Sequence, residues 1–424
     1  MMYFAKGSPD YAFHSDELKE IVFATLDKLE PKKKILAIPP DFTRFHSRAG
    51  ELTRYVYEYY GNRLTDILPA LGTHFPMTDE EIKKMYPGVP VSLFRVHNWW
   101  EDVATVGTVP GEFVRDVSEG VVDYPIPIQI NRLLLENDYD LILSIGQVVP
   151  HEVIGMANYN KNIFVGVGGT ECINKSHFIG ATYGMERIMG RALGPVRKVL
   201  NYASEHFVSD LPIIYLQTVI SEGKDDLQMR GLYIGDDYNC FEKAAALSFK
   251  TNFRMMDREM QKVVVYLDPE EFRSTWLGNK SIYRTRMAIA DNGELIVLAP
   301  GLRQFGEDAV IDKLIRKYGY IHTPQVLNYV KENEDLQNNL SVAAHLIHGT
   351  SEGRFRITYC PGHITRQEIE SVGYQYADLD EMMQKYNPAV LKDGWNEVDG
   401  EEIYYISNPA LGLWAYHERF DTLH

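Results

Sequence analysis

Short apolar runs alternate with helical patterns through the first half of the chain. Residues 50–60 carry apolar side chains at helical spacing, and Thr78 with Glu81 forms a capping box that predicts a helix ending near residues 87–88. Runs typical of strands are expected over residues 34–38, 66–71, 91–96 and 139–145. This alternation indicates an α/β domain with a mainly parallel sheet.

A second series of strand patterns begins after Arg258. Residues 262–267 and 294–300 are the clearest apolar runs there, and no low-complexity linker precedes them. At 424 residues the chain is too long for one ordinary core. We therefore predict two α/β domains with mainly parallel sheets, an N-terminal domain over residues 1–257 and a C-terminal domain over residues 258–399.

The composition argues against several classes of protein. With 45% hydrophobic and 24% charged residues, the chain has enough apolar material for a sizeable interior. The excess of 59 acidic over 43 basic residues gives a net charge of −16, which argues against nucleic-acid binding and requires any attraction of a small anion to be local. The start lacks the apolar run of a signal peptide, and no segment approaches the ~20 apolar residues of a membrane span. We expect a cytoplasmic protein without a membrane partner.

The cysteines and two of the histidines predict little chemistry. The three cysteines are scattered and lack Cys-x-x-Cys spacing, so neither a disulfide framework nor a zinc ribbon is indicated. Cys172 precedes His177 by five residues, which leaves a ligand role open, but a buried thiol is favoured. His345 and His348 lie in an apolar stretch without an acidic or thiol third ligand, which favours a structural role.

Five separated segments carry side chains suited to catalysis. They are Asp41-Phe-Thr43-Arg44, Gly72-Thr-His74, His151-x3-Gly155-x5-Lys161, the later His177, and Trp276-x3-Lys280. Asp41, His74 and His151 each come just after a predicted strand. Because ligands bind outside the carboxyl ends of the strands in open α/β sheets, these three segments are predicted to meet in one crevice.

Together these segments resemble the nickel-dependent lactate racemase family, in whose order and at whose spacing they occur. The resemblance implies a cofactor, the nickel-pincer nucleotide (pyridinium-3-thioamide-5-thiocarboxylic acid mononucleotide), that is covalently bound to Lys161 as a thioamide. It places a protein ligand of Ni at His177 and cofactor contacts at Asp41 and Thr43. It also implies that cofactor-biosynthesis enzymes are partners, that the active site lies in the cleft between the domains, and that residues from about 400 to 424 complete the N-terminal domain.

The side chains themselves suit inversion at C2 of a 2-hydroxy acid. A C–H bond next to a hydroxyl and a carboxylate is weakly acidic, so hydride removal by a cofactor is easier than deprotonation. The hydroxyl proton leaves with the hydride, and inversion needs a base on either face of C2, which His74 and His151 provide. The guanidinium of Arg44 matches a substrate carboxylate. By resemblance, Lys280 and Trp276 lie near the substrate, where the ammonium stabilises the keto acid.

Departures from the lactate-specific members concern the substrate. Bulky polar residues occupy positions 158–160, directly before Lys161, and Trp276 stands where the lactate enzymes have tyrosine. Arg303 adds a further polar group after a predicted strand. We therefore predict a substrate-binding role for Arg303 and a longer hydroxylated substrate, a sugar acid such as gluconate that is epimerised at C2, rather than lactate.

Two other interpretations come from different classes of protein. A zinc-dependent hydrolase or dehydrogenase would use His74, His151 and His177 as zinc ligands, but it leaves Arg44 and Lys161 without roles and lacks a motif for a soluble cofactor. A non-catalytic binding protein would have kept the fold alone, which the intact Lys161 argues against.

Overall fold

The computed structural model describes residues 1–29, 31–223, 226–410 and 412–421. The chain forms two compact units, of which the first contains Met1–Ser176 and Gly190–Asn252 and the second contains His177–Met189 and Phe253–His424. Both units are α/β, and most neighbouring strands in their main sheets are parallel. The predicted fold class is confirmed. The chain leaves the first unit at Asn252 rather than near residue 257, and the second unit also takes the segment His177–Met189.

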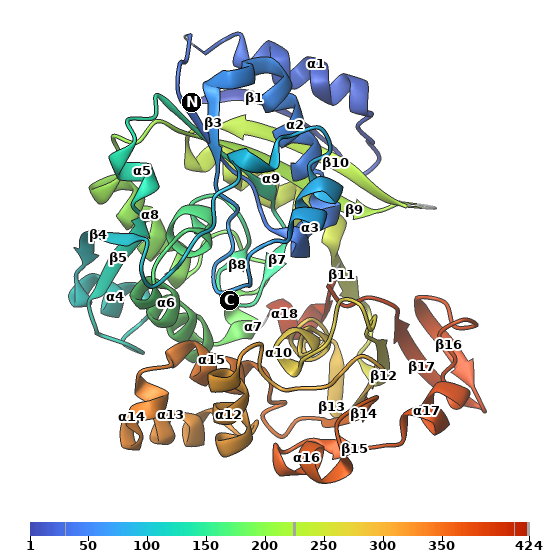
Figure 1. The fold of residues 1–424 in the computed structure, drawn as a ribbon. Helices are drawn as coiled ribbons and strands as arrows, with labels where there is room; N and C mark the ends of the chain where they lie inside the picture. Colours follow the sequence, from blue (N-terminus) through green and yellow to red (C-terminus); the bar gives the residue numbers. More distant parts are fainter. Residues whose placement is uncertain (30, 224–225, 411, 422–424) are drawn as a thin grey trace. The chain divides into compact units, whose positions relative to one another are not determined.

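The sheet of the first unit has the strand order β1-β10-β9-β6-β2-β3 (Figure 1). Its strands are β1 (Met2–Gly7), β2 (Ile35–Ile38), β3 (Leu64–Ile67), β6 (Leu141–Gln147), β9 (Ile213–Glu222) and β10 (Leu227–Gly235). β9, β6, β2 and β3 run parallel, while β10 and β1 are antiparallel additions at one edge. Every residue of β2 is buried, as expected for a strand that is covered on both faces.

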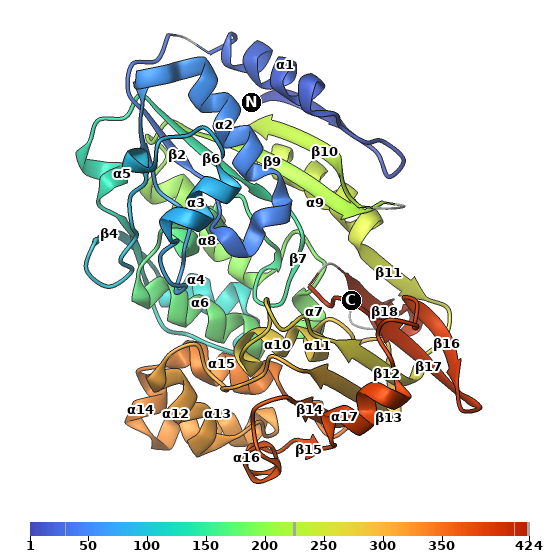
Figure 2. The same cartoon turned by 45° about the vertical axis from the view of Figure 1, so that its right-hand side comes forward.

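Helices cover both faces of this sheet. On one face, α1 (Ser15–Leu26) and α2 (Ala49–Tyr60) lie side by side and bury apolar residues against β2 and β6 (Figures 1 and 2). On the other face, α9 (Tyr238–Asn252) packs on β9, where the Gln217 amide contacts the Cys240 sulfur at 3.4 Å. The carboxyl ends of the parallel strands remain available for loops.

Smaller elements complete the first unit. α3 (Asp79–Met85) begins at the predicted capping box, because the Thr78 and Glu81 side chains each bond the other's backbone N–H. The others are β4 (Val103–Val109), α4 (Gly111–Val117), β5 (Ile126–Asn131), α5 (Leu133–Glu136), β7 (Pro150–His151), β8 (Gly155–Met156) and α8 (Pro195–Phe207). α6 (Thr170–Tyr183) starts in this unit and ends in the second.

The predicted strand over residues 91–96 is wrong. The segment forms a 3-10 turn over Val91–Leu93 and then a single bridge between Phe94 and Ile67 at the edge of the sheet. It is only partly buried, and Val96 is 58% exposed. One half-exposed bridge is too little pairing to extend the sheet.

The main sheet of the second unit has the order β15-β14-β13-β12-β17-β16. Its strands are β12 (Met260–Tyr266), β13 (Ile289–Ala299), β14 (Arg356–Pro361), β15 (Gln375–Tyr376), β16 (Gly394–Val398) and β17 (Glu401–Ile406), and only β16 is antiparallel to its neighbour. Its helices include α10 (Thr275–Gly278), α11 (Lys280–Tyr283), α12 (Ala309–Tyr318), α13 (Thr323–Glu332), α14 (Glu334–Gln337), α15 (Leu340–His348), α16 (Arg366–Ser371) and α17 (Leu379–Lys385).

The C-terminal segment does not return to the first unit. β17 pairs in parallel with β12, and its Tyr405 and Ile406 are buried. β18 (Leu413–Tyr416) pairs with β11 (Phe253–Met256) in the same unit. The prediction that residues from about 400 complete the N-terminal domain is therefore wrong, because the backbone of β17 pairs with β12 and its apolar side chains join the core of the second unit.

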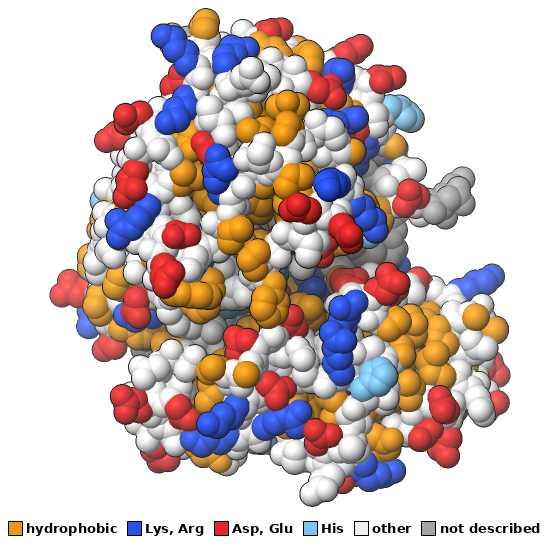
Figure 3. Space-filling view, in the orientation of Figure 1, with side chains coloured by type: hydrophobic (Ala, Val, Ile, Leu, Met, Phe, Trp, Pro, Cys, Tyr) orange, Lys and Arg blue, Asp and Glu red, His pale blue; other side chains and the backbone are white. Residues whose placement is uncertain are grey.

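One face of the molecule shows how charged and apolar side chains are distributed. On the face drawn in Figure 3, acidic and basic side chains are interspersed with apolar ones, and the coloured residues there form no single basic patch. In the part of the chain that the structure describes, no helix is long and apolar enough to cross a membrane.

Candidate active site

The loops after β2 and β3 meet the segment that follows Lys161. Ala70 donates its N–H to the Pro39 carbonyl at 2.7 Å, and Gly72 donates to the Gly166 carbonyl at 2.8 Å. A β-carbon on Gly166 would lie 2.7 Å from the Ala70 side chain, so only glycine permits this approach. The predicted convergence is confirmed for the Asp41 and His74 loops, and for the His151 segment it stays a prediction.

Asp41 organises one end of this edge. It caps the short helix Phe42–Ser47, and its Oδ1 accepts hydrogen bonds from the Thr43 N–H at 3.2 Å and the Thr43 hydroxyl at 2.5 Å. Its Oδ2 lies 2.6 Å from His74 Nδ1. Burial alone would raise the pKa of Asp41, but His74, Thr43 and the charge of Arg44 outweigh burial and lower it. An ionised carboxylate only accepts, so His74 donates from Nδ1 and leaves Nε2 as the basic nitrogen.

His151 is held in the opposite tautomer. It lies in β7, whose pairing with β8 makes a tight turn that Gly155 closes with a φ of +84°. The Nδ1 atom of His151 accepts a hydrogen bond from the Val153 N–H at 3.1 Å, so the neutral ring carries its proton on Nε2. Glu152 Oε2 lies 3.7 Å from the same Nδ1. The His151 side chain is 11% exposed, against 39% for His74.

Lys161 and Arg44 are two cationic groups near Asp41 and Glu152. Burial, and next the charge of Arg44, lower the pKa of Lys161 to about 8, while Glu152 and Asp41 act in the opposite direction. The amine is therefore partly neutral near physiological pH, although the side chain keeps some contact with solvent. Arg44 is half-buried and makes no ion pair with any described residue. Its fork is thus available for an anionic ligand.

The polar residues before Lys161 are committed to the interior of the unit. Asn158 donates to the Gly146 carbonyl at 3.0 Å, and Asn160 donates to Asn201 at 2.8 Å. The Tyr159 ring stacks on Phe241 with centroids 5.3 Å apart and is 6% exposed. The expectation that these three side chains contact a substrate is wrong, because Asn158 and Asn160 are bonded in the interior and Tyr159 packs on Phe241.

The second unit gathers its own group of predicted residues at the carboxyl edge of its sheet. The backbone N–H of Trp276 donates to the Phe305 carbonyl at 2.9 Å, and the backbone N–H of Arg303 donates to the Arg273 carbonyl at 3.0 Å. The loops after β12 and β13 therefore lie side by side. The Lys280 ammonium lies 5.5 Å from the Phe272 ring centroid, and the side chain of Arg303 is exposed. His177 lies in α6, within the second unit.

His345, His348 and Cys172 are buried in the protein interior. His345 is buried, lies 4.4 Å from the Trp276 ring, and places Nε2 2.9 Å from the Tyr320 hydroxyl. His348 is also buried. Cys172 has no exposed surface, and burial raises the pKa of its thiol to about 12. Among the described residues no group of three or more His, Cys, Asp or Glu side chains is arranged to hold a metal, so a zinc site of three histidines has no geometric support.

Three features of the site were not foreseen. The role of Asp41 in orienting His74 depends on contact between loops 33 residues apart. Glu152 has no place in the motif, although it adjoins His151. Arg197 is fully buried behind the Lys161 loop, and its only signal was a charge within the apolar pattern of Val196, Val199 and Leu200.

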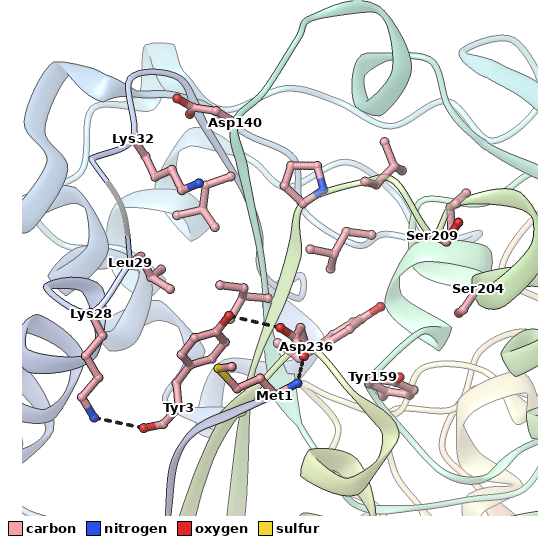
Figure 4. Close-up of a pocket in the computed structure, with 17 residues that line it drawn as sticks. Met1, Tyr3, Lys28, Leu29, Lys32, Asp140, Tyr159, Ser204, Ser209 and Asp236 are labelled. Carbon is pink, nitrogen blue, oxygen red and sulfur yellow. Dashed lines mark hydrogen bonds and ion pairs between the residues drawn. The ribbon is translucent and has the colours of Figure 1, made fainter.

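A separate cavity of about 610 Å³ lies at the other end of the first sheet. Its lining includes Leu141 and Ile213, the first residues of β6 and β9, so it faces the amino ends of the parallel strands. Figure 4 shows the Lys28 ammonium bonded to the Tyr3 carbonyl and the Tyr3 hydroxyl bonded to Asp236 beside it. None of the predicted catalytic residues lines this cavity, and the candidate active site is elsewhere.

Comparison with known proteins gives matches over part and over nearly all of the chain. Residues 19–187 match the family described as the lactate racemase N-terminal domain. A crystal structure of a protein from Thermotoga maritima is 27% identical, with a TM-score of 0.83, over 96% of this chain and 99% of that one. The lactate racemase apoprotein from Thermoanaerobacterium thermosaccharolyticum is 17% identical, with a TM-score of 0.69, over 94% of this chain and 92% of that one. No curated protein matches the sequence.

The fold and the site define a two-unit α/β protein whose first unit gathers two imidazoles, a free guanidinium and a partly neutral amine. The matched family segment, residues 19–187, contains all of these groups. The family match over residues 19–187 agrees with the resemblance inferred from the motifs, and the match to the lactate racemase apoprotein shows that the two proteins share a fold.

Proposed function

We propose that the protein is an isomerase that inverts C2 of a 2-hydroxy acid by reversible hydride transfer. The observation that carries the proposal is that a hydrogen bond at Nδ1 orients each imidazole, to Asp41 in His74 and from the Val153 N–H in His151, so that Nε2 is the nitrogen left for proton transfer in both rings. A reaction that removes a hydroxyl proton on one face and returns one on the other needs one neutral imidazole to accept the proton and one imidazolium to donate it. After each turnover the two histidines have exchanged roles.

Arg44 is proposed to bind the substrate carboxylate. Its guanidinium makes no ion pair with a described residue and presents two parallel donors that match two carboxylate oxygens. Its neighbour Asp41 is already engaged by Thr43 and His74, so the two groups do not neutralise each other by direct contact. The net charge of −16 would repel an anion at long range, so this local cation is required.

The chain's residues fit the nickel-pincer nucleotide that the family implies. Lys161 offers an amine that burial and Arg44 keep partly neutral, as a nitrogen that forms a thioamide must be. We propose that Lys161 holds the cofactor, that Asp41 and Thr43 border it and that His177 is the protein ligand of Ni. When bound, the group would supply the acceptor and donor of hydride. The enzymes that make it would be partners of this chain.

The second unit is proposed to select the substrate. Trp276, Lys280 and Arg303 come from adjoining segments at one edge of its sheet, and they combine an aromatic face with two cations. Such a surface suits a polar, hydroxylated tail, and we propose a sugar acid such as gluconate. A site built to bond hydroxyls rejects analogues that lack them by large factors.

A substrate panel tests this proposed function. Protein made together with the cofactor-synthesis enzymes is incubated with single stereoisomers of 2-hydroxy acids, and inversion at C2 is followed by chiral chromatography. We expect C2 inversion, with gluconate turned over faster than lactate. Lactate as the best substrate would overturn the sugar-acid assignment, and no inversion of any acid by fully loaded protein would overturn the proposed function.

Replacing Asp41 by asparagine removes the negative charge beside His74 but keeps a side chain of the same size. Because the folded-state pKa is lowered, ionised Asp41 stabilises the fold above its ordinary pKa of about 4, and this contribution is lost as the pH falls through the lowered value. Asp41→Asn should therefore lose about 1–3 kcal/mol of unfolding free energy at neutral pH. Urea unfolding at neutral and acidic pH measures this loss, which should shrink in acid; an equal loss at both would contradict the assigned charge state.

A further inference from the structure

Arg197 is a buried cation without an anionic partner. It is the third residue of α8 and has no exposed surface, yet it makes no ion pair with any described residue. Burying an isolated charge is costly. The buried Nε atom of Arg197 has no hydrogen-bond partner among the described residues, so the charge depends on the acceptors of the two terminal nitrogens. The hydrogen-bond acceptors of Arg197 therefore indicate which segment the buried guanidinium stabilises.

All of these acceptors belong to the loop that leads into Lys161. The two terminal nitrogens of Arg197 donate to the Met156 carbonyl at 2.7 Å, to the Asn158 carbonyl at 3.3 Å and to the side-chain oxygen of Asn160. The guanidinium also lies 4.2 Å from the ring centroid of Phe241. The guanidinium thus holds the loop by several hydrogen bonds from its planar group, and a cation–π contact with Phe241 stabilises it.

These hydrogen bonds from Arg197 to residues 156–160, called the Arg197 clasp below, hold a loop whose backbone is strained. Asn158 and Tyr159 are consecutive non-glycine residues with φ of +70° and +58°, in the left-handed region that L residues disfavour. Asn160 is held by a second contact, since its amide donates to Asn201 at 2.8 Å and to Ser204 at 3.1 Å. Arg197, Asn201 and Ser204 are spaced four and three residues apart and share one face of α8.

We propose that Arg197 is a positioning residue that fixes the strained backbone over residues 156–160 and so sets the direction from which Lys161 enters the site. The guanidinium donates hydrogen bonds to loop carbonyls that would otherwise accept from backbone N–H groups. The loop conformation that it holds places Lys161 directly before the π-helical segment Asn162–Gly166. The functional importance of Lys161 rests on the proposed function, but the clasp itself does not.

The test measures the amine of Lys161 in the apoprotein, without any activity assay. Trace labelling with acetic anhydride over a range of pH, read by mass spectrometry of the peptide that contains Lys161, gives the pH of half-reaction. The wild type is expected to show a midpoint near 8. Arg197→Met should raise this midpoint by at least about one pH unit, because the released loop exposes the amine to water and because the Arg197 charge, which lowers the Lys161 pKa, is lost. Arg197→Lys keeps that charge, so a raised midpoint in Arg197→Lys reports the loop alone. Backbone hydrogen exchange over residues 156–166 should become faster in the same variant.

Two further variants keep the test decisive. Val199→Ala removes a buried side chain from the same helix and should lower stability while leaving Lys161 labelling at the wild-type midpoint. Arg197→Lys keeps a charge but not the fork, so it should fail to restore the wild-type midpoint, and it carries the test if Arg197→Met does not fold. Wild-type labelling and exchange in either Arg197 variant, or an equal shift in Val199→Ala, would overturn the proposal. Because the apoprotein is used, a failed proposed function leaves this result unaffected.

Discussion

Lys161→Ala is expected to abolish both cofactor attachment and C2 inversion while the protein stays folded. Alanine has no nitrogen for a thioamide, and Lys161 makes no hydrogen bond on which the described fold depends. Its removal should even relieve some burial of a charged group. Intact-mass measurement on protein made with the cofactor-synthesis enzymes should show an adduct on the wild type and none on the variant.

A neighbouring lysine supplies the control for this experiment. Lys198 is exposed, lies next to Arg197 in α8 and belongs to no part of the site, so Lys198→Ala should keep both adduct and activity. Peptide mapping should place the added mass on the peptide that contains Lys161. Active wild-type protein with Lys161 unmodified would exclude the assigned attachment.

His74→Ala and His151→Ala are each expected to reduce inversion in both directions by about 10²–10⁴-fold. Each turnover takes a proton with one imidazole and returns one with the other, so loss of either ring stops both directions. Initial rates from each pure stereoisomer measure the effect. The exposed His206 provides the control, since it lies at the last turn of α8 and, among the described residues, hydrogen-bonds only the Tyr202 carbonyl, and His206→Ala should leave the rates unchanged.

The two variants should also differ in stability. His151 is buried and accepts a hydrogen bond from the Val153 N–H, which His151→Ala would leave unsatisfied at a cost of about 1–3 kcal/mol. His74 is more exposed, and its loss chiefly removes a partner of Asp41. If both variants kept near-normal rates, the two-base mechanism would be wrong whatever their stability.

Much of the first unit could be predicted because its signals are local. β2 is a run of four buried apolar residues, and α3 begins at a capping box, and both patterns depend on residues close in sequence. The failures involve distant partners. The predicted strand over residues 91–96 lacks a full neighbour at the sheet edge, and β17 joins β12 across more than a hundred residues. Local patterning contains no information on either pairing.

The site shows the same division. Motif spacing singled out His74, His151, Lys161 and Arg44 as candidate site residues, because the proposed chemistry requires these residue types. It did not show that Asp41 holds His74, or that positions 158–160 face the interior, since both depend on how loops pack. The polar residues before Lys161 suggested contact with a substrate. In the structure, the Asn158 carbonyl and the Asn160 side chain instead accept hydrogen bonds from the buried Arg197.

The fate of the hydrogen on C2 tests the central claim most directly. Loaded protein inverts a single stereoisomer in D2O, and NMR or mass spectrometry measures deuterium at C2 of the product. Reversible hydride transfer returns the original hydrogen, so the account predicts an inverted product with the C2 hydrogen retained, while His74 and His151 exchange only the hydroxyl proton. Deuterium at C2 in step with inversion would show that the histidines deprotonate carbon, and it would contradict the hydride mechanism.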